Sequence, residues 1–159
     1  MDDVAIYQKT IDLAIKSITN NGGPFSALIV KDGKIIGTGI NQVSNNHDPT
    51  AHAEIMAIRD ACQATKNFEL TGCTLYASSE PCPMCLSAIY WTRLDRVFYL
   101  NGIKEAKNAG FDDSFIYKEI IRPNSEKKIP IIQSNNTRLV NSAKKIFQLW
   151  QEKTDRINY

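Results

Sequence analysis

The order of hydrophobic patterns along the chain constrains its fold most strongly. Residues 2–20 carry apolar side chains at helical spacing behind an acidic start, which predicts an amphipathic helix. Residues 24–41 hold two apolar runs around Asp32-Gly33, a dipeptide that favours a hairpin turn. Helix and strand patterns then alternate. Helices are predicted over 51–65, 84–93 and 140–154, short helical segments within 101–119, and strands over 73–78, 96–100 and 128–133. This order predicts a three-layer α/β domain in which helices cover a mixed sheet on both faces.

Length and composition fit one folded domain over residues 1–159, with 43% hydrophobic and 23% charged residues. The formal net charge of +2 is too small to indicate a nucleic-acid or membrane partner. No stretch approaches the ~18 apolar residues of a membrane span, and the acidic, polar N-terminus does not resemble a signal peptide. The 4 cysteines are expected to be reduced thiols, so a cytoplasmic location is predicted.

The stretch "EPCPMC" places Cys82 and Cys85 three residues apart behind two prolines. Pro83 fits the first turn of a helix, so both cysteines are predicted at a helix N-terminus, where the helix dipole favours thiolate. Thiolate is the form that binds metal. By itself, the pair is equally compatible with a redox dithiol or with two buried apolar side chains.

The stretch "TAHAEI" supplies a third possible metal ligand. Thr50 is a candidate helix cap, so His52 is predicted in the first turn of the next helix, with Glu54 two residues later. His52, Cys82 and Cys85 together make three zinc ligands and leave a fourth position for water, which is the catalytic arrangement. Glu54 is then the acid and base beside that water. Taken singly, His52 and Glu54 are ordinary residues for the start of a helix.

His52-Ala53-Glu54 followed by Pro81-Cys82-Pro83-Met84-Cys85 resembles the signature of the zinc-dependent nucleobase deaminases. The resemblance implies the cytidine-deaminase-like fold, with a five-stranded sheet between helices. It also implies one Zn²⁺ per subunit with a bound water. In such a site zinc lowers the pKa of its water toward ~7, and Glu54 would carry protons from that water to the base and to the departing ammonia.

Residues 109–120, "AGFDDSFIYKEI", are similar to those of the small bacterial guanine deaminases, as are "GGPFSALIVKDG" and "HDPTAHAE". This closer resemblance implies hydrolysis of guanine to xanthine and ammonia. Guanine presents N–H donors, and a second carboxylate near the zinc would accept from its amino group. Asp113 is the candidate for this role, with Asp112 as second choice. Alternatively, Asp113 only caps the helix that follows.

Further contacts to the base follow from the same resemblance. Asn41, at the end of the hairpin, matches the residue that holds the base, and Ala53 stands between the two motif residues His52 and Glu54. Phe25 and Trp91 are candidate stacking walls, although residues of their type usually belong to the core. Tyr159 is similar to a tail residue that closes the pocket.

The resemblance implies a homodimer in which residues 137–159 cross to the partner subunit. Three other functions remain open. A tRNA adenosine deaminase shares the zinc motif but needs clustered basic side chains for the RNA backbone. A cytidine or guanosine deaminase uses the same chemistry on a nucleoside. A structural zinc or redox module would require a fourth protein ligand, for which the sequence offers no suitably spaced Cys or His.

Overall fold

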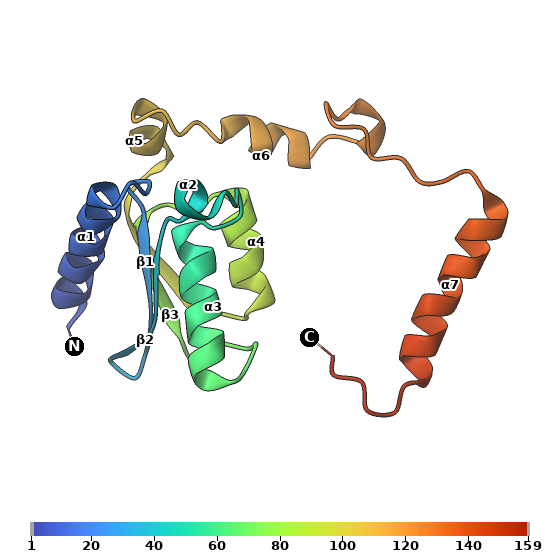
Figure 1. Cartoon of the computed structure of the whole chain (residues 1–159), viewed down its shortest axis with the longest axis horizontal. Coiled ribbons are helices and arrows are strands. Elements are labelled where there is room, and N and C mark those ends of the chain that lie inside the picture. The colour runs from blue at the N-terminus through green and yellow to red at the C-terminus, as the bar shows by residue number, and fades with distance from the viewer. Residues whose placement is uncertain (1, 159) are drawn as a thin grey trace. The chain divides into compact units, whose positions relative to one another are not determined.

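The computed structural model describes residues 2–158, and Figure 1 shows how its elements follow one another. Up to β4 the elements follow the predicted order, with the short helix α2 added before α3, whereas only helices and one 3₁₀ turn are described after β4. Their bounds are α1 Asp3–Thr19, β1 Ser26–Lys31, β2 Lys34–Ile40, α2 Val43–Asn46, α3 Ala53–Thr65, β3 Thr74–Ser79, α4 Pro83–Trp91, β4 Arg96–Asn101, α5 Ile103–Asn108, α6 Ser114–Ile120, the 3₁₀ turn η1 Asn124–Glu126 and α7 Thr137–Glu152.

The sheet is mixed, as predicted, in the strand order β2-β1-β3-β4. Strand β1 pairs antiparallel with both β2 and β3, whereas β3 and β4 are parallel. Asp32 and Gly33 both have positive φ, 49° and 70°, as a tight hairpin turn that matches the strand twist requires. The described residues form four strands, so the expected fifth strand over 128–133 is wrong for this structure. That segment is irregular, and Pro130 at its centre cannot donate to a strand ladder.

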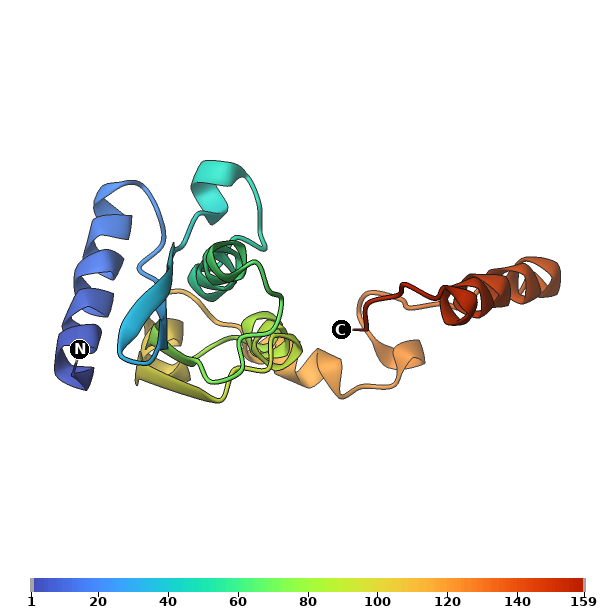
Figure 2. The ribbon, with the colours of Figure 1, turned by 90° about the horizontal axis from the view of Figure 1, so that it is seen from below.

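Two apolar clusters place helices on both faces of the sheet. Ala27 and Ile29 of β1 pack in a cluster with α3, whereas Leu28 and Val30 pack in a second cluster with α1. The alternation follows from the two-residue period of a strand. Figures 1 and 2 show α1 on one side of the sheet and α3 with α4 on the other. The predicted three-layer α/β arrangement is therefore confirmed within residues 1–113.

Two glycines let α3 lie unusually close to β2. A Cβ on Gly37 would meet the Ala57 carbonyl oxygen at 2.5 Å, and one on Gly39 would meet the Ala53 carbonyl oxygen at 2.0 Å. No side chain larger than hydrogen fits at either position without moving the helix. This close packing determines how far the start of α3, which follows His52, stands from the sheet.

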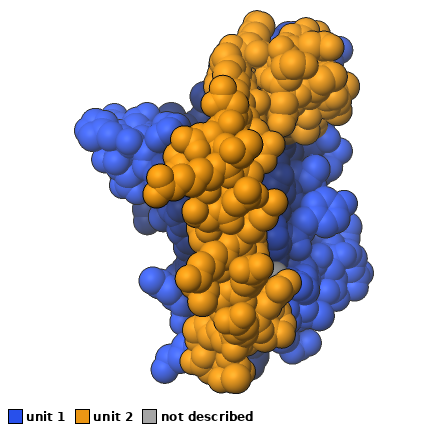
Figure 3. Space-filling view, turned by 90° about the vertical axis from the view of Figure 1, so that its right-hand side faces the viewer, with its two compact units in different colours: residues 1–113 blue, residues 114–159 orange. Residues whose placement is uncertain are grey.

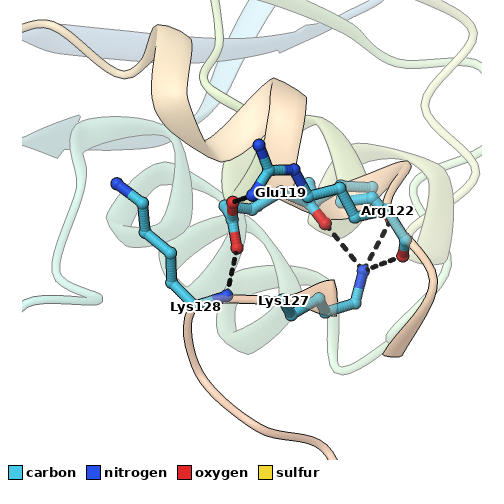
Figure 4. A network of polar contacts seen from close by, with 5 residues as sticks. Glu119, Arg122, Lys127 and Lys128 are labelled. Atoms are coloured by element: carbon cyan, nitrogen blue, oxygen red, sulfur yellow. Dashed lines mark hydrogen bonds and ion pairs between the residues drawn. The ribbon is translucent and has the colours of Figure 1, made fainter. Parts of the chain in front are cut away.

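The chain divides into two compact units, residues 1–113 and 114–159, which Figure 3 distinguishes by colour. In the second unit, the Lys127 ammonium donates to the carbonyl oxygens of Glu119, Ile120 and Arg122 at 2.6, 3.1 and 2.6 Å (Figure 4). A cation at the C-terminal end of α6 satisfies carbonyl groups that have no partner within the helix. Among residues 2–158, no helix is both long and apolar enough to span a bilayer.

Candidate metal centre

His52 stands immediately before α3 rather than inside its first turn. Its backbone is extended, with φ −68° and ψ 156°, and Ala53 is the first helical residue. Thr50, the predicted cap, instead donates its N–H and its hydroxyl to Asp48 Oδ1 at 2.8 and 2.7 Å. The preceding turn thus uses the side chain of Asp48, and His52 occupies the cap position without a side-chain hydrogen bond to the helix.

Cys82 and Cys85 lie where the prolines predicted them. Cys82 is the extended residue before α4, and Pro83 occupies the first helical turn, where a missing N–H is harmless. Cys85 follows in that turn and is fully buried, whereas Cys82 is half-buried. Two helix N-termini therefore meet at this place, one behind His52 and the other at the cysteine pair.

The three predicted ligands converge. His52 Nδ1 lies 3.5 Å from Cys82 Sγ and 3.5 Å from Cys85 Sγ, and all three ligand atoms lie within 4.8 Å of one another. With Zn–S and Zn–N bonds of about 2.3 and about 2.0 Å, tetrahedral geometry separates a sulfur from a nitrogen by about 3.5 Å. The donor set and its spacing therefore fit zinc with three protein ligands.

The electrostatics of these three side chains also favour a cation. Hydrogen bonds from Cys85 and His52 lower the pKa of Cys82 to about 4, so this sulfur is a thiolate at neutral pH. The hydrogen bond with Cys82 and burial raise the pKa of Cys85. The Cys82 thiolate likewise raises the pKa of His52 through its hydrogen bond. A divalent ion would stabilise a second thiolate and a neutral imidazole, so binding should release protons.

Glu54, in the first turn of α3, lies beside this cluster and is only 8% exposed. Burial raises the pKa of Glu54 to about 7, and the charge of Cys82 adds to the rise. A bound cation would oppose part of this shift. A carboxyl group whose pKa is near neutral can both accept a proton and return it, as the predicted acid and base role requires.

The structure separates the two neighbouring aspartates. Asp112 forms an ion pair with Lys107, with Oδ2 and Nζ 3.0 Å apart. Asp113 is half-buried, and burial together with the charge of Cys82 raises the pKa of Asp113. The charge of Asp113 in turn contributes to the raised pKa of His52. Asp113, the first choice from the sequence, therefore interacts electrostatically with two of the metal ligands, His52 and Cys82.

Asn41 and Phe25 are joined by a backbone hydrogen bond next to the start of β1. The Asn41 N–H donates to the Phe25 carbonyl oxygen at 3.0 Å, and Asn41 is 7% exposed. Its carboxamide oxygen accepts from the Val43 N–H at 3.2 Å, which orients the carboxamide and leaves its nitrogen side as the donor. Ala53, fully buried between His52 and Glu54, lies at the first position of α3.

One expected contact, Trp91, does not lie at this centre. Trp91 ends α4 and is 63% exposed. At 1.5 Å per residue, it stands about 13 Å along the helix from Cys82, so a single chain does not bring its ring to the metal ligands. Tyr159 lies outside the described residues. The sequence analysis missed Phe111, whose ring packs against Phe25. The Gly110-Phe111 pair directly after α5 is the signal that could have located it.

The sequence model of the cytidine and deoxycytidylate deaminase zinc-binding region matches residues 1–101, which include all three ligands and Glu54. The chain belongs to this family. The resemblance that the sequence motifs suggested is thereby confirmed, and so is the expected use of zinc. Family membership also explains why two helix N-termini, otherwise unremarkable, carry a histidine and two cysteines toward one point.

The chain is similar to individual members of this family to different extents. The guanine deaminase of Bacillus subtilis (strain 168) is 46% identical over 160 aligned residues, 100% of each chain. The X-ray structure of guanine deaminase from Bacillus subtilis superposes with a TM-score of 0.93 and covers 100% of this chain and 99% of that one. A tRNA-specific adenosine deaminase of Buchnera aphidicola is 42% identical, but over 92 residues, 58% of this chain and 61% of its own length.

Proposed function

We propose that this zinc-dependent deaminase hydrolyses guanine to xanthine and ammonia. The observation that carries the proposal is the extent of the match. The Bacillus guanine deaminase aligns with the whole chain, whereas the Buchnera tRNA deaminase aligns with 58% of it. Residues 102–159 lie beyond the shared zinc-binding region and include Asp113, the carboxylate proposed to accept from the guanine amino group.

His52, Cys82 and Cys85 would hold the ion, since their spacing suits a tetrahedral site. Zinc, when bound, supplies a Lewis acid that activates water at neutral pH. Glu54 would hold and move the proton, because burial raises the pKa of its carboxyl to about 7. It would take a proton from the attacking water and deliver it to a ring nitrogen, and it would then assist departure of ammonia.

Asp113 would accept from the guanine amino group, and its raised pKa favours a shared proton at this contact. The Asn41 carboxamide would donate to the base. Phe25, which is anchored between Asn41 and β1, would form an apolar wall for the purine ring. The Ala53 backbone at the start of α3 would contribute a polar contact next to Glu54.

The same observations disfavour the other functions. An RNA backbone would approach a site where Glu80, Asp112 and Asp113 gather negative charge, and phosphates are repelled there. A purely structural zinc site needs four protein ligands. Among residues 2–158, the cluster of Cys, His, Asp and Glu groups close enough to hold an ion contains only His52, Cys82 and Cys85.

A homodimer with an exchanged C-terminal segment belongs to the same proposal. Helix α7 carries exposed apolar side chains at helical spacing, including Ile146 at 66% and Phe147 at 73% exposure. Such a stripe is stable only when another surface covers it. We expect residues 137–159 to pack on a second copy and to bring Tyr159 to its pocket. The cytoplasmic location stays a prediction.

A substrate panel tests the reaction. Ammonia release is measured for the zinc-loaded protein with guanine, guanosine, cytosine, cytidine, adenine and a tRNA anticodon stem-loop. Guanine is expected to give the highest kcat/KM. Ammonia from the stem-loop alone would instead assign the chain to tRNA editing, and preference for guanosine would assign it to nucleosides.

Subunit mixing tests the exchange. Glu54→Gln and Tyr159→Ala chains, each expected to be nearly inactive alone, are unfolded together and refolded as a mixture. In a swapped heterodimer, one pocket combines an intact Glu54 with the tail of the other chain, so activity returns. A mixture as inactive as its components would exclude the exchange.

A further inference from the structure

We propose that Phe111 is a positioning residue that holds Asp113 beside the metal ligands by packing against Phe25. The inference rests on the proposed function, in which Asp113 contacts the guanine amino group. It concerns the segment between α5 and α6, which carries Asp113 but has no regular secondary structure of its own.

The contact between the two rings has the geometry of a favourable aromatic pair. The Phe25 and Phe111 centroids are 4.8 Å apart, and the ring planes meet at 82°. This edge-to-face arrangement directs the positive edge of one ring at the negative face of the other. Phe25 is a firm base, because it precedes β1 directly, packs against the core cluster and accepts from Asn41.

The end of α5 delivers Phe111 to this contact. The Phe111 N–H donates to the Ala106 carbonyl oxygen at 3.0 Å, and the Gly110 N–H donates to the Lys107 carbonyl oxygen at 3.0 Å. This pair of bonds is a Schellman ending, which requires a left-handed residue after the helix. Gly110 has φ 95°, and a Cβ there would meet nothing within 4 Å. The glycine is needed for its backbone conformation and not for space.

A second restraint acts just beyond the ring. Asp112 pairs with Lys107 of α5 at 3.0 Å, so this side chain is drawn back toward the helix. Asp113, the next residue, is half-buried and interacts with the charges of Cys82 and Glu80. The ion pair fixes the segment to α5, but α5 itself is short and exposed. The contact between the Phe111 and Phe25 rings therefore joins residues 109–113 to the part of the core that also holds Asn41.

This placement matters because a carboxylate acts on a bound base only within hydrogen-bond reach. A misplacement of about 1 Å can cost about 10²-fold in rate. Phe111 is itself 45% exposed, so its removal leaves no large cavity and should spare the fold. Loss of the ring is therefore expected to affect Asp113 more than stability.

The decisive experiment is a double-mutant cycle on kcat/KM for guanine. Phe111→Ala is expected to lower kcat/KM about 10-fold or more in the wild-type background. In an Asp113→Asn background the same change should cost less than about 2-fold, because there is no longer a carboxylate to position. Phe111→Tyr keeps the ring edge and should retain wild-type kinetics.

Two further measurements separate positioning from general damage. Hydrogen exchange over residues 109–114 should accelerate in Phe111→Ala while zinc content stays stoichiometric. Phe98→Ala is the matched control, because it removes a ring that contacts Tyr76 at 5.4 Å on the sheet face covered by α1. That variant should lose stability and keep kcat/KM.

Equal losses in both backgrounds, or wild-type turnover in Phe111→Ala, would overturn the proposal. An Asp113→Asn variant with unchanged kinetics would overturn it together with the assigned role of Asp113, while guanine hydrolysis would stand. If the wild-type chain does not hydrolyse guanine, the proposed function fails. Hydrogen exchange over residues 109–114 is then the only test, and an unchanged exchange rate in Phe111→Ala would reject the positioning role of Phe111.

Discussion

Replacing Gly39 by alanine should push the catalytic helix away from the sheet. Gly39 lies in β2 beneath α3, where an added Cβ would stand 2.0 Å from the Ala53 carbonyl oxygen and 2.4 Å from the Ala57 nitrogen. Both obstacles are backbone atoms, so no side chain can rotate out of the way. Ordinary contact begins at 3.4 Å, and the start of α3 must therefore retreat by roughly 1 Å.

The displaced end of α3 is the one that follows His52 and carries Glu54. Overpacking of this kind destabilises a fold by about 1–3 kcal/mol, and a shift of about 1 Å at reacting groups costs about 10²-fold in rate. We expect Gly39→Ala to unfold at lower urea concentration, to bind zinc less tightly and to lose kcat/KM by about that factor.

Gly37→Ala is the matched comparison. Its Cβ would meet the Ala57 carbonyl oxygen at 2.5 Å, one helical turn farther from the metal ligands. Urea unfolding followed by circular dichroism should show a similar loss of stability for both variants, with the larger loss of turnover in Gly39→Ala. Wild-type stability and turnover in Gly39→Ala would refute the packing argument. Equal losses of turnover in Gly37→Ala and Gly39→Ala would refute the claim that the effect depends on distance from the metal ligands.

Three further predictions concern single groups. Glu54→Gln should keep stoichiometric zinc, measured by elemental analysis, and lose turnover by about 10²-fold or more, because the amide cannot move a proton. Cys85→Ser should lose zinc together with activity, since it removes one of three ligands. Tyr76→Phe deletes the bond from the phenol to Asp3 Oδ1 at 2.6 Å and should cost about 1 kcal/mol. Burial and that bond raise the pKa of Tyr76 from 10.0 to about 12, so the unfolded chain loses this proton first. Wild-type stability should therefore fall between those pH values more steeply than that of Tyr76→Phe, as measured by urea titrations.

The parts of this protein that the sequence predicted correctly depend on local signals. Pro83 marks the first turn of α4, and the residues around His52 mark the start of α3, so the ligands could be assigned to two helix tips. The turn at Asp32-Gly33 depends on a backbone preference of those two residues. Each of these signals acts within a few residues, so the local structure that it predicts does not depend on contacts with the rest of the chain.

The predictions that failed concern features that depend on the position of a residue relative to distant parts of the chain. The apolar run over 128–133 has strand-like composition, but a strand needs a neighbouring edge, and Pro130 weakens any pairing. Trp91 has the right chemistry for a stacking wall, yet it lies at the far end of α4 from Cys82. Phe111 escaped attention because its contact with Phe25 joins segments far apart in the sequence.

The metal ligands come from two separate connections, the one that leads from α2 into α3 and the one that leads from β3 into α4. An ion bound by residues of both connections would link them to each other and stabilise the fold, in addition to its role in catalysis. Saturation at a hundred times its dissociation constant would add about 2.7 kcal/mol to the free energy of unfolding. Copies of the protein without zinc would thus be inactive and also less stable, so the lifetime of this deaminase would depend on the supply of metal.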